Sequence, residues 1–311
     1  MKNNKSRLRY WLNLLTVTAL SFALTFFILI LYASNRWVQS YLHPVRNIPT
    51  GAVLVENNIP YREVELITED GINLAAWYTP PQPALPQENR DNVSGVEGNG
   101  AVILVAHGYD GNRPEDIYVM FAKHGYGVLA WDFRAHGQSG GDTCSLGYYE
   151  QLDVEAALDY ALKQADVKHI GAWGGSMGAA TVILTAAKHP EIEAVVSDSA
   201  FPSLEDVMRL NTPIRIMQPF VLFFGGRLSG AKMDQVRPVD EIAKISPRAV
   251  FIIDGWDGAA VAMNSPYRFF DAAGEPKQLW VEEGVPHLTM YANDPMGYEK
   301  RVIIFFDEYL K

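Results

Sequence analysis

Short apolar runs alternate with longer segments of helical spacing along most of the chain. AVILVAH (101–107) and YGVLAWDF (126–133) are two of these runs, and each is followed by a helical pattern. Short buried strands separated by helices are typical of a parallel sheet that is covered on both faces. The pattern therefore predicts an α/β fold with a mostly parallel, doubly wound sheet.

The sheet is expected to begin with an antiparallel hairpin at residue 61. YREVELIT (61–68) and INLAAWYTP (72–80) both read as strands, and a tight acidic turn separates them. The next segment, 80–100, is rich in Pro, Asn and Gly and is predicted to be a surface loop. Asn92 begins an Asn-Val-Ser glycosylation pattern in this loop.

One long segment, about 201–247, interrupts the alternation of strands and helices. It contains two predicted helices, FPSLEDVMRL (201–210) and QPFVLFFGGRL (218–228). Segments beyond the carboxyl ends of parallel strands frame ligand sites, so we predict a small helical lid here. Its apolar side chains suggest a hydrophobic acyl pocket, although such residues at helical spacing more often serve ordinary packing: Phe201, Met217, Phe220, Phe223 and Phe224.

The N-terminal region carries an uncharged run from Trp11 to Ala33. As a helix, this run is long enough to cross a hydrocarbon core of about 30 Å, and it exceeds the apolar core of a signal peptide. Four basic residues precede it: Lys2, Lys5, Arg7 and Arg9. Because basic flanks stay in the cytoplasm, we predict a single-pass anchor in the cell membrane, 1–35, followed by an extracytoplasmic domain, 36–311.

Composition narrows the classes of partner. The chain is 48% hydrophobic and 20% charged, which is ordinary for a globular protein with a sizeable core. The net charge of -10 argues against a nucleic-acid partner, which would need a basic face. Cys144 is the single cysteine, so an internal disulfide is excluded. Cys and His residues show no zinc spacing, and no structural zinc is expected.

Ser176 stands in a pattern typical of a catalytic nucleophile. The strand-like HIGAWG (169–174) precedes it, a helical segment follows it, and Gly174 and Gly178 flank it. This is the G-x-S-x-G context in which a sharp turn lifts a serine hydroxyl above a sheet. A helix-capping serine beside packing glycines is the alternative. A nucleophilic serine also needs a base beside it.

Two backbone amides are expected to stabilise the negative oxygen of an attacked carbonyl. The first belongs to Met177, directly after the serine. The second is expected after an earlier strand, where AVILVAH runs into Gly108 and the amide of Tyr109 comes next. The phenol of Tyr109 could add a third donor, but we favour its amide.

His107-Gly108, DFRAHGQSGG (132–141) and GGSMG (174–178), in this order, resemble the α/β-hydrolase superfamily. The resemblance covers about residues 61–311. Within the superfamily, the chain more specifically resembles membrane-anchored bacterial hydrolases of the esterase and acyl-peptidase-like branch. A G-x-x-E-x-x-D signature recurs in that branch, and here its residues are Gly147, Glu150 and Asp153. The resemblance implies the fold and serine chemistry, but no substrate. It also implies structural roles for four residues: His107, Asp132, Arg134 and His136.

His287 is the predicted base. It lies between the last predicted strand and the last helix, where the chain order Ser, Asp, His of this fold requires the histidine. A solvated loop histidine is the alternative. The histidines elsewhere in the chain do not fit that order: His43, His124, His169 and His189. Resembling proteins have glycine-x-glycine-histidine here, so Val285-Pro286 is a mild departure.

The acid is expected after the predicted strand RAVFII (248–253). Resembling proteins show histidine-glycine-x-x-aspartate-x-x-valine-proline, and this pattern puts the aspartate at Gly258. Asp257 stands one residue earlier and is the predicted acid, which would hold the imidazole and stabilise its charged form. Asp254, Asp198 and a site with no working acid remain open.

The sequence thus predicts a membrane-anchored serine hydrolase that cleaves an ester or similar acyl bond of a small-molecule substrate. Ser176, His287 and Asp257 form the predicted triad, and the Tyr109 and Met177 amides form the oxyanion hole. No metal or organic cofactor is needed. One alternative is a peptidase or amidase of the same fold. Another is a non-catalytic binding protein with a degraded triad, which only the displaced acid supports.

Overall fold

The computed structural model describes residues 2–82 and 100–311. Most of the predicted surface loop and its Asn92 pattern lie outside the described residues. One eight-stranded sheet has the order β1-β2-β4-β3-β5-β6-β7-β8. The strands are β1 (Arg62–Ile67), β2 (Asn73–Thr79), β3 (Ala101–Ala106), β4 (Gly127–Trp131), β5 (His169–Gly175), β6 (Ala194–Asp198), β7 (Ala249–Trp256) and β8 (Lys277–Glu283).

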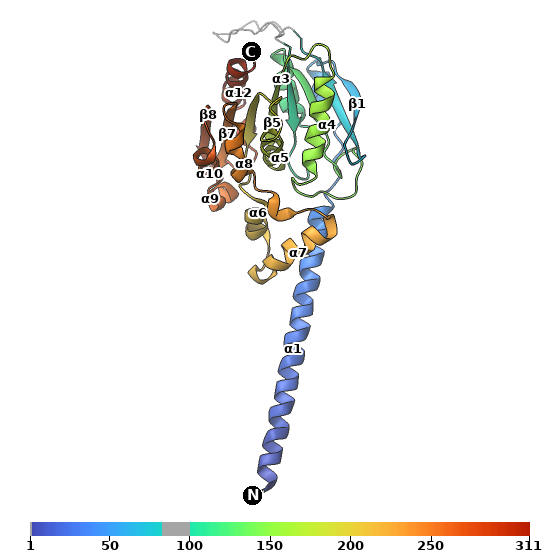
Figure 1. Ribbon diagram of the computed structural model, residues 1–311, viewed down its shortest axis with the longest axis vertical. Helices are drawn as coiled ribbons and strands as arrows, with labels where there is room; N and C mark the ends of the chain where they lie inside the picture. The colour runs from blue at the N-terminus through green and yellow to red at the C-terminus, as the bar shows by residue number, and fades with distance from the viewer. Residues whose placement is uncertain (1, 83–99) are drawn as a thin grey trace.

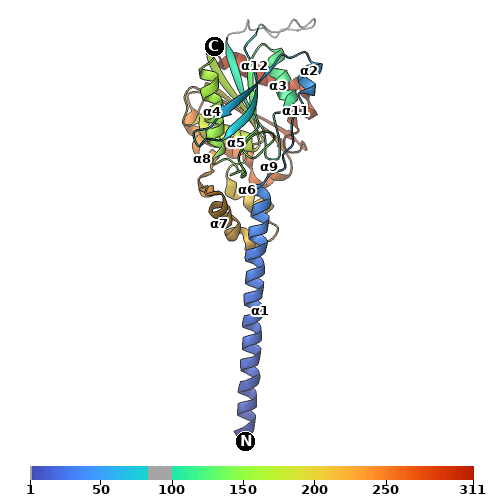
Figure 2. The ribbon, with the colours of Figure 1, turned by 90° about the vertical axis from the view of Figure 1, so that its right-hand side faces the viewer.

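The sheet is mostly parallel, as predicted. β2 runs antiparallel to β1 and β4, which confirms the hairpin, and the remaining strand pairs are parallel. Helices cover both faces (Figures 1 and 2). The larger ones are α3 (Glu115–Lys123), α4 (Glu150–Leu162), α5 (Met177–Ala186), α10 (Ser265–Ala272) and α12 (Pro295–Tyr309). Shorter helices connect these elements: α2 (Ala52–Glu56), α8 (Pro238–Glu241), α9 (Gly258–Met263) and α11 (Met290–Asn293).

The alternation of side chains along β3 builds two cores. Val102 and Leu104 pack into the cluster that contains α4 and α5. Ile103 and Val105 point to the other face and pack with α3 and α12. Because successive strand residues face opposite sides, a fully apolar strand must be covered on both sides. The unbroken apolar runs of the sequence follow from this requirement.

The N-terminal helix α1 (Lys2–Leu42) is longer than the predicted anchor. It is the one helix of the described chain that is long and apolar enough to cross a membrane, and its apolar stretch is almost fully exposed. Figure 1 shows it projecting from the domain. The helix continues without a break past residue 35, and Val38 and Leu42 are buried in the core of the domain. Pro44 explains its end, because the residue before a proline disfavours helical backbone.

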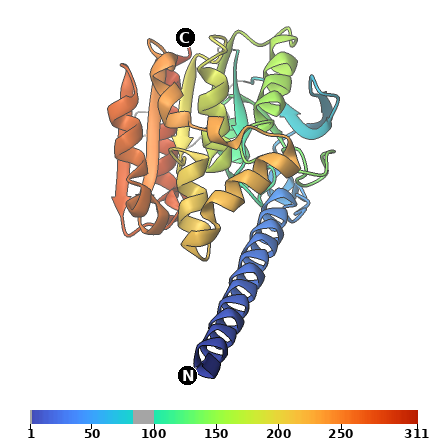
Figure 3. The same cartoon turned by 60° about the horizontal axis from the view of Figure 1, so that its bottom comes forward.

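Two helices lie between β6 and β7, within the segment predicted as a lid: α6 (Leu204–Asn211) and α7 (Gln218–Ser229). The hydroxyl of Ser203 caps α6 by accepting the Asp206 amide at 3.1 Å. Gly230, with φ +74°, ends α7 in the left-handed conformation that favours glycine. Figures 1 and 3 show both helices at the end of the domain from which α1 emerges.

Candidate active site

Ser176 occupies a strained turn between β5 and α5. Its backbone has φ 52° and ψ -111°, a conformation that costs a non-glycine residue about 1–3 kcal/mol. A Cβ at Gly178 would collide with the Ala106 carbonyl, and one at Gly174 would collide with Ala179. The two glycines of the motif are therefore required by close packing of backbone around the turn. The turn leaves Ser176 at the edge of a pocket.

His287 meets this serine from a distant part of the sequence. It lies in the turn between β8 and α11, and its Nε2 is 2.9 Å from the Ser176 hydroxyl oxygen. The surrounding protein removes water from the imidazole and so lowers the pKa of His287 below its ordinary value. A neutral ring with its proton on Nδ1 can accept the serine proton at Nε2. The structure thus brings the predicted nucleophile and base together.

A buried hydrogen-bond chain holds the turn that carries His287. The Leu288 amide donates to the Ser199 hydroxyl at 3.2 Å, and that hydroxyl donates to Asp198 at 2.8 Å. The phenol of Tyr298, on α12, donates to the other Asp198 oxygen at 2.7 Å. Asp198 was one of the open candidates for the acid, but both its oxygens bind these neighbours. Ser199 and Tyr298 had no signal in the local sequence.

The predicted acid is not joined to the base. Asp257 is exposed, and its carboxylate accepts the amide of Gly258 at 2.7 Å. Asp254 is only 2% exposed, and its Oδ1 has no hydrogen-bond partner. Within the described ranges, no hydrogen bond links Asp257, Asp254 or Asp198 to His287. The role of Asp257 therefore stays a prediction.

Burial sets the charge of the two strand-end carboxyls. Desolvation raises the pKa of Asp254 to about 7, and the nearby charge of Asp198 adds to the shift. Desolvation also raises the pKa of Asp198 to about 6, although the Tyr298 and Ser199 hydroxyls oppose the shift. At neutral pH a large share of Asp254 is consequently protonated.

Two amides predicted to form the oxyanion hole belong to residues that line the pocket of Ser176. Met177 is the first residue of α5, and Tyr109 lies in the turn after β3. In the part of the chain that the structure describes, neither amide donates to another backbone group. Both residues line the same pocket as Ser176. The helix N-terminus at Met177 adds a partial positive charge that favours an anion.

The phenol of Tyr109 points to α1. It donates to the Ser40 carbonyl at 3.3 Å, and its ring stacks on that of Tyr41 with a centroid separation of 5.6 Å. This contact occupies the phenol, so the amide is the better candidate for the oxyanion. It also joins the oxyanion turn directly to the N-terminal helix.

His107 braces the oxyanion turn. Its Nε2 accepts the Phe133 amide at 2.9 Å, and its Nδ1 donates to the Gly108 carbonyl at 2.6 Å. Burial lowers the pKa of His107 to about 3, so the ring is neutral. Both ring nitrogens are thus used to shape the backbone.

The G-x-x-E-x-x-D signature also shapes a wall of the site. Buried Glu150 accepts the Gly147 amide at 2.7 Å and the Ser145 amide at 2.8 Å. Buried Asp153 accepts the Arg134 side chain at 2.7 Å. These bonds fix the loop that carries Leu146, and Leu146 lines the pocket beside Ser176.

The pocket at Ser176 and His287 has a volume of about 590 Å³. Three separate regions supply its walls. They are the end of α1, the α6 region and the residues around α9: Ser40, Tyr41, Phe201, Leu204, Val207, Leu210, Asn211, Ala259 and Met263. Of the lid residues expected to form an acyl pocket, Phe201 lines it. Met217 is buried in the core, and Phe223 is 64% exposed on the surface.

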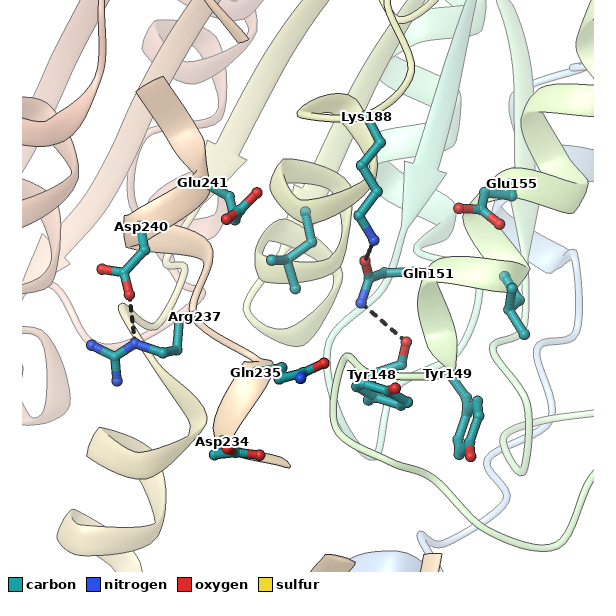
Figure 4. Close-up of a pocket in the computed structure, with 12 residues that line it drawn as sticks. Tyr148, Tyr149, Gln151, Glu155, Lys188, Asp234, Gln235, Arg237, Asp240 and Glu241 are labelled. Carbon is teal, nitrogen blue, oxygen red and sulfur yellow. Dashed lines mark hydrogen bonds and ion pairs between the residues drawn. The ribbon is translucent and has the colours of Figure 1, made fainter. Parts of the chain in front are cut away.

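Neither Ser176 nor His287 lines a second pocket, which has a volume of about 640 Å³ (Figure 4). Lys188 there donates to Gln151 at 2.7 Å, and Arg237 donates to Asp240 at 2.5 Å. Both of these basic side chains thus bind neighbouring protein atoms, and the lining as a whole mixes acidic and basic groups. We assign it no function.

Comparison with known proteins supports this architecture. The family described as alpha/beta hydrolase fold matches residues 101–237. The uncharacterized protein YqkD of Bacillus subtilis is 30% identical over 216 residues, which are 66% of this chain and 70% of that protein. A lysophosphatidylserine lipase of Danio rerio is 23% identical over 227 residues, 68% of this chain and 58% of that one.

A solved esterase of Pyrococcus furiosus has a similar structure. The TM-score is 0.68 at 24% identity, with 88% of this chain and 99% of that chain covered. At this identity the similarity concerns the fold alone. The family match, the coverage of YqkD and the strand order agree with the motifs of the sequence, and together they show that the chain belongs to the α/β-hydrolase superfamily.

Proposed function

We propose that the protein is a membrane-anchored serine hydrolase that cleaves an ester or similar acyl bond. The fold and the esterase and lipase relatives support hydrolase activity in general. The observation that carries the finer proposal is the 2.9 Å approach of His287 Nε2 to the hydroxyl of Ser176, which sits on a strained elbow. A base at this distance is what a serine needs to act as a nucleophile.

The geometry supports an acyl-enzyme mechanism. Ser176 Oγ attacks the carbonyl carbon while its proton passes to His287 Nε2. The amides of Tyr109 and Met177 bind the oxyanion of the tetrahedral intermediate. His287 then donates the proton to the leaving oxygen, and the carbon–oxygen bond breaks. Water repeats the attack on the acyl-enzyme with His287 as base, which releases the acid and restores Ser176.

Asp257 remains our proposed acid. Its turn leads into α9, and Ala259 on that helix lines the same pocket as His287. The carboxylate is exposed and bound to the adjacent amide of Gly258, so rotation of the side chain meets little resistance. Asp254 is a poorer partner for an imidazolium, because burial keeps much of it protonated at neutral pH.

The membrane assignment rests on α1. Its apolar run is exposed and preceded by basic residues, which favours a cytoplasmic N-terminus and an extracytoplasmic catalytic domain. Impermeant maleimide applied to intact cells can test this orientation, since the native Cys144 is buried. We expect a Glu283→Cys variant to be labelled and a Ser6→Cys variant to be protected. The reverse result would invert the topology.

A fluorophosphonate probe tests the chemistry. We expect the wild type and Ser246→Ala, a change at an exposed serine, to be labelled, and Ser176→Ala to remain unlabelled. A wild type without label would favour the non-catalytic binding protein. Paired p-nitrophenyl esters and p-nitroanilides then separate an esterase from an amidase, and faster turnover of the anilide would contradict the ester proposal.

A further inference from the structure

Helix α7 lies beside the apolar part of α1. The ring of Phe220 packs edge-on against Phe27, with a centroid separation of 5.7 Å. Phe27 stands six residues before Ala33, where the uncharged run ends. At about 1.5 Å per residue, Phe27 is therefore about 9 Å inside the end of the run. Figures 1 and 3 show α7 alongside this part of α1.

The surface around α7 is apolar. Ile214 is 55% exposed, Ile216 is 52% exposed and Phe223 is 64% exposed. Leu210 and Leu228 extend the same region with 44% and 41% exposure. Clustered exposed apolar side chains mark a surface that contacts another apolar phase. Their position beside the apolar run of α1 identifies that phase as the lipid that surrounds the helix.

The charge of this region fits the same partner. Residues 207–233, which we name the interfacial segment, contain no acidic residue in a chain of net charge -10. Its basic residues are Arg209, Arg215, Arg227 and Lys232. Apolar side chains flanked by Lys and Arg are typical of helices that lie in the headgroup region of a membrane. Basic groups also attract anionic lipids.

This segment and α1 both contribute walls to the pocket at Ser176. Val207, Leu210 and Asn211 line it from one side, and Ser40 and Tyr41 line it from the other. Tyr41 comes eight residues after Ala33 on the same unbroken helix. At about 1.5 Å per residue, the pocket wall is therefore only about 12 Å beyond the apolar run.

We propose that the interfacial segment lies in the headgroup layer of the membrane, and that an acyl chain of a membrane-resident ester reaches Ser176 between this segment and α1. The proposal rests on the anchor and on the serine chemistry proposed above. It names the substrate class as esters that are dissolved in the bilayer. The outer apolar residues of the segment contact lipid, while its inner residues form the entrance to the pocket.

A depth measurement on the full chain tests the placement without any activity. Bimane is attached to Phe223→Cys, to Leu20→Cys in α1 and to Met296→Cys, a site that is 83% exposed on α12. The proteins are reconstituted in vesicles of phosphatidylglycerol and doxyl-labelled phosphatidylcholine. We expect quenching at positions 20 and 223 and none at 296. Quenching at 20 alone would overturn the interfacial segment and leave the anchor standing, and no quenching at 20 would remove the anchor itself.

A comparison of two esters tests the route of entry. Phe223→Glu with Ile216→Glu is expected to lower hydrolysis of 4-methylumbelliferyl oleate in these vesicles by about tenfold, because the charges lift the segment from the lipid. Hydrolysis of soluble p-nitrophenyl acetate should stay within about twofold of the wild type, since neither residue lines the pocket. Phe223→Leu is the matched control and should retain both activities.

Equal loss of both activities, or no loss of either, would contradict entry along the segment. A wild type that hydrolyses neither ester would instead contradict the proposed serine chemistry. In that case the quenching experiment still decides where the segment lies.

Discussion

The turns after β5 and β7 lie at the same edge of the sheet, yet they are built very differently. Close packing constrains the backbone around Ser176: Gly174 and Gly178 have no room for a side chain, and the Ser176 amide binds the Asp198 carbonyl at 2.8 Å. Asp257, after β7, is exposed and bonds to the next residue. A Cβ at Gly258 would meet no atom within 4 Å. The proposed nucleophile is thus held by the core, whereas the proposed acid lies in a loosely packed turn.

Removal of the proposed acid should have the largest effect on activity among changes at these two turns. We expect Asp257→Asn to lower kcat for a p-nitrophenyl ester by up to about 10⁴-fold, because the imidazole would lose its orienting partner. Asp254→Asn should stay within about tenfold of the wild type, since much of that carboxyl is already neutral. If Asp254→Asn were the inactive variant, the acid would lie on the strand and not in the turn.

A shift of the carboxylate by one residue tests how loose the turn is. Gly258 has φ +48°, a conformation that aspartate tolerates, and open space where its side chain would be. In the Asp257→Asn background, Gly258→Asp should therefore recover kcat by about tenfold, with the rest lost to imperfect placement. Gly258→Ala in that background is the control and should recover nothing. No recovery by the aspartate would mean that the turn tolerates one register only.

The pH profile should show whether the proposed acid, Asp257, acts on His287. His287 must be neutral to accept the serine proton, so kcat/KM falls as the pH falls through its pKa. Desolvation lowers this pKa below the ordinary 6.5, and an ionised Asp257 beside the ring would raise it. We therefore expect a higher midpoint of the acidic limb in the wild type than in Asp257→Asn, and equal midpoints would contradict Asp257 as the acid. The measurement is kcat/KM for a soluble ester between about pH 4 and pH 9.

The smallest effect concerns stability. Burial raises the pKa of Asp254 to about 7 in the folded chain, against 3.8 ordinarily, so the folded state binds more protons between these values. The free energy of unfolding therefore declines as the pH rises through this range. Asp254→Asn removes the penalty and should raise Tm relative to the wild type more at pH 8 than at pH 5, by about 2 °C or more. Asp257→Asn, at an exposed site, should show no such pH-dependent gain.

Much of this architecture could be predicted because it depends on local pattern. Fully apolar strands and the small residues around Ser176 reflect nearby sequence, and His287 follows from the chain order that the resembling fold requires. Other features depend on contacts that no local pattern contains. The Ser199 and Tyr298 hydroxyls meet at Asp198 only after folding, from different strands and helices.

The displaced acid and the length of α1 show two further limits. A motif specifies the spacing of residues along the chain, but a turn can accommodate a shift of one residue. The sequence could therefore propose Asp257 as the acid, but it could not predict where its carboxylate lies. The apolar run ends at Ala33, whereas the helix continues to Leu42 because Val38 and Leu42 find apolar neighbours in the domain. The end of the predicted anchor was thus inferred from the polarity of the sequence, whereas the end of the helix depends on tertiary packing.

The unbroken course of α1 has a kinetic consequence. Without a hinge between Ala33 and Tyr41, the catalytic head cannot swing on a flexible tether. On the proposed topology, the pocket keeps a fixed position relative to α1, and its orientation to the bilayer follows the tilt of that helix. Encounters with substrate then become a two-dimensional search set by lateral diffusion, and turnover should follow the surface density of the ester more closely than its bulk concentration.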